Sequence, residues 1–177
     1  MKDHWSNKMG EVWNKEKKID DNESEQYRDI IREFISKYHS TTLSYFLTIR
    51  KNGQPVMRPV STFVEGWDIY TISQHHQVKV QHVKNNANVG YLFTDNEGDA
   101  YMPLGYTKNV WVSGICEIIT DQSEIEEFFI RREKGTGQGD AHPHDNTYTR
   151  LLFKTKLNYL RAEGFAEHAR PIIYKHF

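Results

Sequence analysis

Residues 56–86 read VMRPVSTFVEGWDIYTISQHHQVKVQHVKNN. Apolar and polar side chains alternate over 55–64 and again over 67–73, which predicts two strands joined by a tight turn at Glu65-Gly66. Valines at helical spacing then predict a short helix over 77–86. The rest of the chain is interpreted around this unit of strand, turn, strand and helix.

Four side chains in this segment are of the types that hold a phosphate monoester. Arg58 lies in the first strand, Thr71 and Ser73 end the second, and Lys79 lies early in the helix. If the two strands form a hairpin, Arg58 lies near the hydroxyls, and the start of the helix adds backbone N–H groups and partial positive charge. The segment therefore predicts a phosphate site. The alternative is that both cations are solvated surface charges.

Upstream of this unit, the spacing of apolar residues predicts a helix over 25–38, with Ser24 as its cap, and then a strand over 41–49. In the strand, the set of side chains predicted to face the core is Leu43, Tyr45, Leu47 and Ile49. Asn52-Gly53 is a strong hairpin signal, so strands 41–49, 55–64 and 67–73 are predicted to follow one another as a meander.

Downstream, the pattern predicts strands over 89–94 and 110–120, a helix over 121–134 and a strand over 151–160. Gly114 is placed where a bulge or bend is expected, and Ser123 with Glu126 fits a capping box. The predicted fold class is α+β, mainly β with flanking helices. We expect a polar arm over 1–22 and a single domain over 23–177.

Composition narrows the classes of function. The chain has 177 residues and a net charge of −1, from 23 basic and 24 acidic residues, which argues against nucleic-acid or anionic-membrane partners. Cys116 is the one cysteine, and no apolar run approaches a bilayer span, so a cytoplasmic protein without disulfides or membrane segments is expected. His142 and His144 lack the spacing of a specific zinc site, so no metal is predicted.

Two runs carry a family resemblance. Residues 46–93 read FLTIRKNGQPVMRPVSTFVEGWDIYTISQHHQVKVQHVKNNANVGYLF, and residues 108–129 read KNVWVSGICEIITDQSEIEEFF. Their order of a strand, a Gly turn, an Arg-x-Val strand, a Tyr-Thr strand end and a Lys-bearing helix resembles the flavin-binding family related to pyridoxamine 5′-phosphate oxidase. The resemblance covers roughly residues 25–130.

The resemblance implies a split antiparallel β-barrel of the FMN-binding type, assembled as a homodimer with FMN at the subunit interface. By position, Arg58 and Lys79 would bind the FMN phosphate, and Thr71 and Ser73 would donate hydrogen bonds to it. The remaining cofactor-binding positions implied are Pro59 and Val60 against the ring, Tyr70, Val78, Asn109 in the place of a ring-contacting Gln, and Trp111.

The implied function is an FMN-binding oxidoreductase that passes hydride or electrons between a reduced donor and a small-molecule acceptor. No catalytic residue is assigned, because the flavin carries such chemistry. Pyridoxamine or pyridoxine 5′-phosphate oxidation is one alternative, with Arg131, Arg132 and Arg150 as candidates for the substrate phosphate. The family's Arg-x-His substrate signature is not evident near the carboxyl end. A non-catalytic flavin- or haem-binding stress or sensor protein is the other alternative.

Overall fold

The computed structural model describes residues 24–39, 42–95, 107–139, 149–166 and 170–177. The arm predicted over 1–22 lies outside the described residues, as do His142 and His144. The helices are α3 (Arg28–Ser36), α4 (Val78–Asn85) and α5 (Gln122–Thr136). The strands are β1 (Ser44–Ile49), β2 (Pro55–Val60), β3 (Phe63–Glu65), β4 (Asp68–Gln74), β5 (Asn88–Thr94), β6 (Asn109–Ile119), β7 (Arg150–Glu163) and β8 (Ile172–Tyr174).

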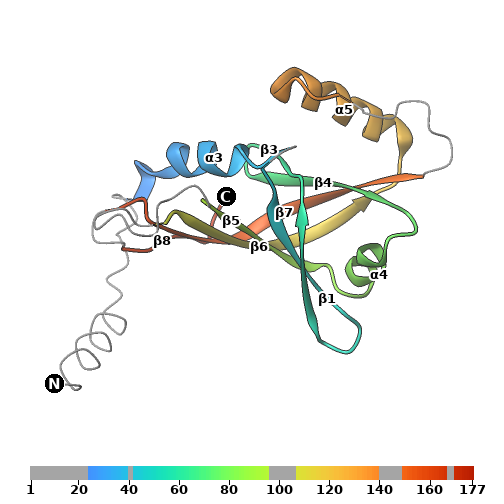
Figure 1. Cartoon of the computed structure of the whole chain (residues 1–177), viewed down its shortest axis with the longest axis horizontal. Helices are drawn as coiled ribbons and strands as arrows, with labels where there is room; N and C mark the ends of the chain where they lie inside the picture. Colours follow the sequence, from blue (N-terminus) through green and yellow to red (C-terminus); the bar gives the residue numbers. More distant parts are fainter. Residues whose placement is uncertain (1–23, 40–41, 96–106, 140–148, 167–169) are drawn as a thin grey trace.

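The strands form one antiparallel sheet in the order β2-β1-β5-β6-β7-β4-β3, with β8 paired to β7. The sheet curls into a split barrel, as predicted (Figure 1). Helix α3 lies along one side, α4 lies beside the β1–β2 hairpin, and α5 lies beyond β4 (Figure 1). No helix in the described ranges is long and apolar enough to cross a bilayer.

The strand predicted over 55–64 is two strands in the structure. β2 pairs with β1, whereas β3 pairs with β4 at the other end of the strand order. The chain crosses at Ser61 and Thr62, and Thr62 is held there because its backbone N–H and its hydroxyl both donate to the Tyr38 carbonyl, at 3.0 and 2.8 Å. The predicted meander, and with it the pairing of Arg58's strand with that of Thr71 and Ser73, is therefore wrong.

The buried face of β1 is the opposite of the one predicted. Ser44, Phe46 and Thr48 are fully buried. Of the set predicted to face the core, Tyr45, Leu47 and Ile49 are only partly buried and Leu43 is exposed. The inner face tolerates hydroxyls because each has a partner: Ser44 Oγ donates to the Val60 carbonyl at 3.3 Å, and Thr48 Oγ1 lies 2.9 Å from a histidine nitrogen.

The helix caps also differ from prediction. Tyr27 precedes α3 without a side-chain cap, and the Ser24 carbonyl accepts from the Tyr27 N–H instead. Asp121 caps α5, since its carboxylate accepts the Glu124 N–H at 3.0 Å. The α5 face of apolar side chains, the strand over 151–160 and the irregularity at Gly114 are confirmed.

The barrel interior is closed by aromatic rings around one buried polar cluster. Phe46 stacks on Tyr91 with ring centroids 4.8 Å apart, and Phe46 also packs on Phe153 at 5.8 Å. The Tyr91 hydroxyl lies 3.2 Å from Thr71 Oγ1 and 3.3 Å from Thr155 Oγ1. This packing fixes the strands whose ends carry the candidate site.

Candidate functional site

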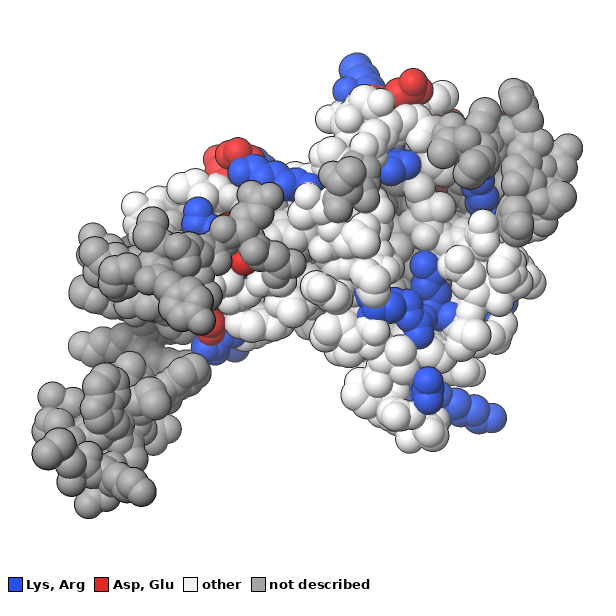
Figure 2. All heavy atoms as spheres, viewed as in Figure 1, with Lys and Arg blue, Asp and Glu red and all other residues white. Residues whose placement is uncertain are grey.

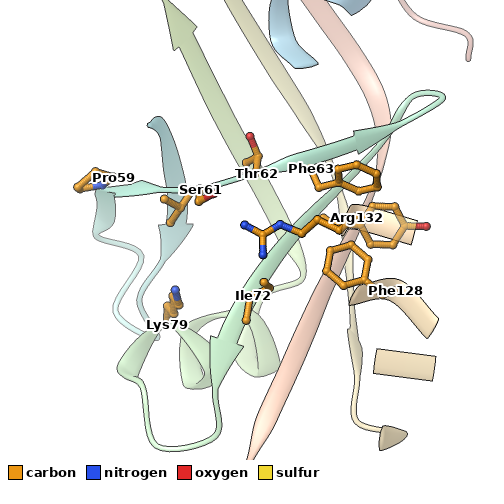
Figure 3. Close-up of a pocket in the computed structure, with 10 residues that line it drawn as sticks. Pro59, Ser61, Thr62, Phe63, Ile72, Lys79, Phe128 and Arg132 are labelled. Atoms are coloured by element: carbon orange, nitrogen blue, oxygen red, sulfur yellow. The ribbon is translucent and has the colours of Figure 1, made fainter. Parts of the chain in front are cut away.

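A pocket of about 130 Å³ lies where four parts of the chain meet. The crossing between β2 and β3 forms one wall, β4 a second, and α4 and α5 contribute one cation each (Figure 3). The lining residues are Pro59, Val60, Ser61, Thr62, Phe63, Tyr70, Ile72, Lys79, Phe128 and Arg132. Four of the predicted cofactor-binding residues are among them: Pro59, Val60, Tyr70 and Lys79.

Lys79 lines this pocket, and Arg58 lies near enough for its charge to act on Lys79. Burial first, and then the charge of Arg58, lower the pKa of Lys79 to about 8. Burial, and then the charge of Arg50, lower the pKa of Arg58. Neither Arg58 nor Lys79 has a hydrogen-bond or ion-pair partner within the described part of the chain. Two partly buried like charges without a counter-ion favour binding of an anion.

A contact with β1 holds helix α4 so that Lys79, in its first turn, reaches the pocket. His82, one turn after Lys79, is buried, and its Nδ1 lies 2.9 Å from Thr48 Oγ1 on β1. Burial, followed by the charges of Arg58 and Arg50, lowers the pKa of His82, so the neutral ring is favoured. His82 is not among the residues predicted from the sequence, although its position three residues after Lys79 places both on one helix face.

The two predicted phosphate-binding hydroxyls have internal partners. Thr71 is buried against Tyr91 in the barrel interior. Ser73 Oγ donates to Gln77 Oε1 at 3.0 Å, and Gln77 is the residue that precedes α4. Ser73 therefore helps to fix the start of the helix. Val78, another predicted cofactor contact, is largely exposed at the first helical position, outside the pocket lining.

The far wall of the pocket is aromatic and carries a third cation. Tyr70 and Phe128 pack with centroids 5.3 Å apart, and Phe63 meets Phe128 edge-on at 5.7 Å. Arg132 extends from α5 past these rings, on the side of the pocket opposite Lys79 (Figure 3). Its guanidinium donates to Gln138 Oε1 at 3.3 Å, and burial lowers its pKa.

The structure distinguishes Arg132 from the two other arginines considered for a substrate phosphate. Arg131 pairs with Glu65 at 3.2 Å, and the Arg150 guanidinium lies 5.2 Å from the Phe129 ring centroid. Neither lines the pocket. Arg132 follows Phe128 by four residues, a spacing that places both side chains on the same face of α5.

Asn109 and Trp111 are not brought together with Arg58 and Lys79 within one chain. Both lie in β6, and their strand parity places them on the outer face of the sheet, where Trp111 is 37% exposed. Asn109 Nδ2 donates to the Thr107 carbonyl at 3.2 Å. Arg58, which pairs with the buried Phe46, lies on the opposite, inner face of the sheet.

Strand register gives Trp111 apolar neighbours on the β5 side and Arg161 as its partner on the β7 side. Tyr45 pairs with Leu92, and Leu92 pairs with Trp111, so the three side chains share a face. The neighbouring row runs from Met57 through Leu47 to Gly90. Together with the exposed Ile115, the apolar outer face is made up of Tyr45, Leu47, Met57, Leu92, Trp111 and Ile115.

Chemically, the site is suited to binding rather than to acid–base catalysis. It offers cations, aromatic rings and backbone groups of the crossing between β2 and β3, and none of the described residues that line the pocket is Asp, Glu or His. Among the described residues, no three side chains of the metal-ligating types cluster together. The arrangement can hold an anionic group at Lys79 and Arg58 and a flat or apolar group against the rings.

Comparisons with known structures support the fold. A structure titled F420 reductase aligns at 15% identity with a TM-score of 0.56, covering 73% of this chain and 94% of that one. General Stress Protein 26 from Bacillus anthracis aligns at 18% identity and 0.57, covering 82% and 98%. A heme binding protein from Mycobacterium smegmatis aligns at 12% identity and 0.60, covering 81% and 56%.

At the level of sequence, no curated protein matches the chain. The family described as pyridoxamine 5′-phosphate oxidase does match, over residues 27–168. That match spans α3 through β7, including both sides of the pocket. The chain therefore belongs to the pyridoxamine 5′-phosphate oxidase family.

Proposed function

We propose that the protein is an FMN-binding oxidoreductase that acts as a homodimer and transfers hydride or electrons between a reduced donor and a small-molecule acceptor. The observation that carries the proposal is the pair Arg58 and Lys79. They lie together, partly buried and without a described carboxylate partner, beside a pocket walled by aromatic rings. A phosphate monoester attached to a planar ring system is complementary to both features.

The two cations match the charge of the FMN phosphate, whereas the pocket of one chain is too small to enclose the whole cofactor. A phosphate monoester carries about −1.5 to −2 charges at pH 7, which the two cations balance. The pocket measures only about 130 Å³, whereas pockets that enclose a whole cofactor or drug-sized ligand run from about 300 to 1,000 Å³. One chain therefore supplies the phosphate end and one wall, and the proposal assigns the rest to a second subunit.

The apolar outer face supports the homodimer. Trp111 and Ile115 on β6 are 37% and 48% exposed, and Met57 on β2, which β1 and β5 separate from β6, is 52% exposed, although all three are large apolar side chains of one sheet. Aromatic residues and Met are enriched in protein interfaces, and contiguous apolar patches on monomers are uncommon. Covering this face with a second copy would also bring Trp111 toward a site built on the partner.

Within the proposed site, the chain's own residues bind and orient. Arg58 and Lys79 hold the phosphate, and Phe63, Tyr70 and Phe128 keep water from the adjoining pocket. When bound, a flavin accepts and donates hydride or single electrons, so no protein acid or base is required for that step.

The first experiment is the absorbance spectrum and mass of whatever co-purifies with the protein. Flavin affinity is then measured for Arg58→Gln and Lys79→Gln, with Lys84→Gln as a matched control, since Lys84 is an exposed lysine on the same helix. Each site variant is expected to lose about 1.5–3 kcal/mol of FMN binding free energy, the range for a charge-assisted contact, and the control is expected to lose none. Equal affinity in all three variants would refute the site.

Oxidation of pyridoxamine or pyridoxine 5′-phosphate is a second candidate, and Arg132 is the observation that favours it. Its guanidinium reaches from α5 into the pocket that Lys79 enters from α4, so the pocket holds a second cation for a substrate phosphate. Turnover of pyridoxamine 5′-phosphate that is lost in Arg132→Gln but kept in Arg131→Gln would establish this activity. Flavin that binds but is not reduced by NADH or NADPH would instead favour storage or sensing.

A further inference from the structure

Arg132 is a second cation in the pocket that Lys79 lines. Figure 3 shows its guanidinium directed from α5 into the pocket, while the Lys79 side chain enters from α4. Arg58 acts on Lys79 through its charge but is not among the described residues that line the pocket. The two cations on either side of this space are therefore Lys79 and Arg132. Figure 2 shows Lys and Arg atoms over α4 and the β1–β2 hairpin, with no Asp or Glu atoms among them in this view.

Contacts on both sides of Arg132 hold it in this position. Phe128, one turn before it, is buried in the hydrophobic cluster that joins α5 to the sheet. Beyond the helix end, Gly137 has a positive φ of +71°, and the chain turns back toward the helix. The Gln138 side-chain oxygen and the Gly139 carbonyl then accept from the Arg132 guanidinium at 3.3 and 3.5 Å. A guanidinium has five N–H donors, so these two bonds leave others for a ligand.

Lys79 is held from the other side by a different part of the core. His82, on the same face of α4, contacts Thr48 on β1 at 2.9 Å. Val80 and Val83 are buried in the barrel core, which is a separate cluster from the one under α5. The pocket therefore lies between two helices that are anchored independently, and each helix contributes one cation to it.

The pocket gathers positive charge without acidic residues to offset it. None of the described residues that line it is Asp or Glu. Burial lowers the pKa of Lys79 and that of Arg132, as expected for cations drawn out of water without a counter-ion. A phosphate monoester carries about −1.5 to −2 charges at pH 7, which matches these two cations.

The volume of the pocket suits a single phosphate group. It measures about 130 Å³, and a cavity of about 150 Å³ accommodates one benzene molecule, which has six heavy atoms. A phosphate group has five heavy atoms, so one group fills most of this space. Two phosphate groups exceed it, and so the two cations are placed to share one anion.

We propose that Lys79 and Arg132 bind opposite sides of one phosphate group, which makes Arg132 a ligand of the cofactor's phosphate. This inference rests on the proposed function and adds a residue to its phosphate site. The guanidinium suits this role because it presents parallel N–H groups to two phosphate oxygens. Oxidation of pyridoxamine 5′-phosphate would instead need Arg132 for a substrate phosphate, and the two assignments predict different effects of Arg132→Gln on cofactor binding.

The test compares FMN with riboflavin, which lacks the phosphate, by fluorescence titration of the full chain freed of flavin. The ratio of FMN affinity to riboflavin affinity is expected to fall about ten- to hundred-fold in Arg132→Gln, as in Lys79→Gln, through loss of a charge-assisted contact. Arg131→Gln is the matched control, because Arg131 precedes Arg132 on α5, pairs with Glu65 at 3.2 Å and does not line the pocket. Its ratio should equal that of the wild type.

The outcomes separate this inference from the proposed function. A substitution that only loosened α5 would weaken both flavins equally, so an unchanged ratio in Arg132→Gln beside a lowered ratio in Lys79→Gln would overturn the role of Arg132 and leave the phosphate site intact. A ratio that falls equally in Arg131→Gln would also overturn it, because the effect would then be one of general charge. Unchanged ratios in Arg58→Gln, Lys79→Gln and Arg132→Gln would overturn the phosphate site itself, and the inference with it.

Discussion

The lowered pKa of Lys79 predicts a specific pH dependence of phosphate binding. Its pKa of about 8 arises from burial and from the Arg58 charge, and a bound phosphate dianion would raise it again. Because the bound-state pKa is higher than the free-state pKa, affinity is full below pH 8 and falls as pH rises through that value. At pH 7 about nine-tenths of the free protein carries a charged Lys79, and at pH 9 about one-tenth does. The dissociation constant for FMN should therefore rise about ten-fold between pH 7 and pH 9.

The assay is a titration of flavin-free protein with FMN, followed by flavin fluorescence across this pH range. The phosphate itself contributes little, since its second ionisation is complete near pH 7. Lys79→Arg is the informative variant, because a guanidinium stays protonated throughout and should give a flat profile. Riboflavin, which lacks the phosphate, should also give a flat profile in the wild type. A flat wild-type profile with FMN, or an equal fall in Lys79→Arg, would refute the reasoning.

Three further changes test the scaffold and the assembly. Gly114→Ala would place a Cβ atom 2.2 Å from the Lys156 carbonyl oxygen, so urea denaturation should show a loss of about 1–3 kcal/mol or more in the free energy of unfolding, and an unchanged midpoint would contradict the close approach. Thr48→Val removes the hydroxyl that pairs with buried His82, and the same assay should show a loss of about 1–3 kcal/mol; wild-type stability would mean that this contact is not made. Trp111→Glu puts a charge on the apolar outer face, so light scattering should show a shift from the proposed dimer to monomer, and a dimer in both proteins would place the interface elsewhere.

Each of these changes has a matched control. Gly53→Ala meets no atom within 4 Å, so it should cost only the strain of a positive φ, about 1 kcal/mol. Thr48→Ser keeps the hydroxyl and should stay close to the wild type. Ile130→Glu changes a residue that is 67% exposed on α5, away from the outer face of the sheet, and should leave the assembly unaltered.

Local sequence signals predicted the elements of this fold well. Asn52-Gly53 predicted the β1–β2 hairpin, and Gly53 has the positive φ, +83°, that such turns require. Gly114 predicted the irregularity in β6, where the register shifts between Ser113 and Gly114. These features depend on backbone conformations that few residue types adopt, so a short stretch of sequence is enough to identify them.

The strand order and the buried face of β1 could not be predicted from such local sequence signals. Both faces of β1 carry apolar side chains, and the inner one also carries Ser44 and Thr48, whose partners come from β2 and α4. A hydroxyl is acceptable in a core only when a partner is present, and such partners are known only after the fold is known. The crossing at Thr62 likewise depends on the distant Tyr38 carbonyl.

In the candidate site too, some residues were predicted from local sequence, and others could be identified only from the packing. Arg58 and Lys79 were predicted because a basic strand residue and a helix start lie near each other in sequence. Arg131, Arg132 and Arg150 were indistinguishable at that level, and only packing places Arg132 in the pocket and the others outside it. The spacing of His82 from Lys79 puts both on one helix face, but it does not reveal the role of His82, which depends on the β1 hydroxyl opposite it.

The two faces of the sheet constrain how the proposed cofactor and the proposed dimer relate. Arg58 and Lys79 lie on the α4 side, whereas Trp111 lies on the outer face, so no single chain surrounds a flavin with both. If the outer face is the subunit interface, loss of the dimer should also remove the part of the cofactor site that the partner supplies. Trp111→Glu should then weaken flavin binding together with dimerisation, while Lys79→Gln should weaken flavin binding in an intact dimer. A monomeric Trp111→Glu protein that binds FMN as tightly as the wild type would show that one chain suffices, and that the pocket at Lys79 opens far enough to hold the whole cofactor.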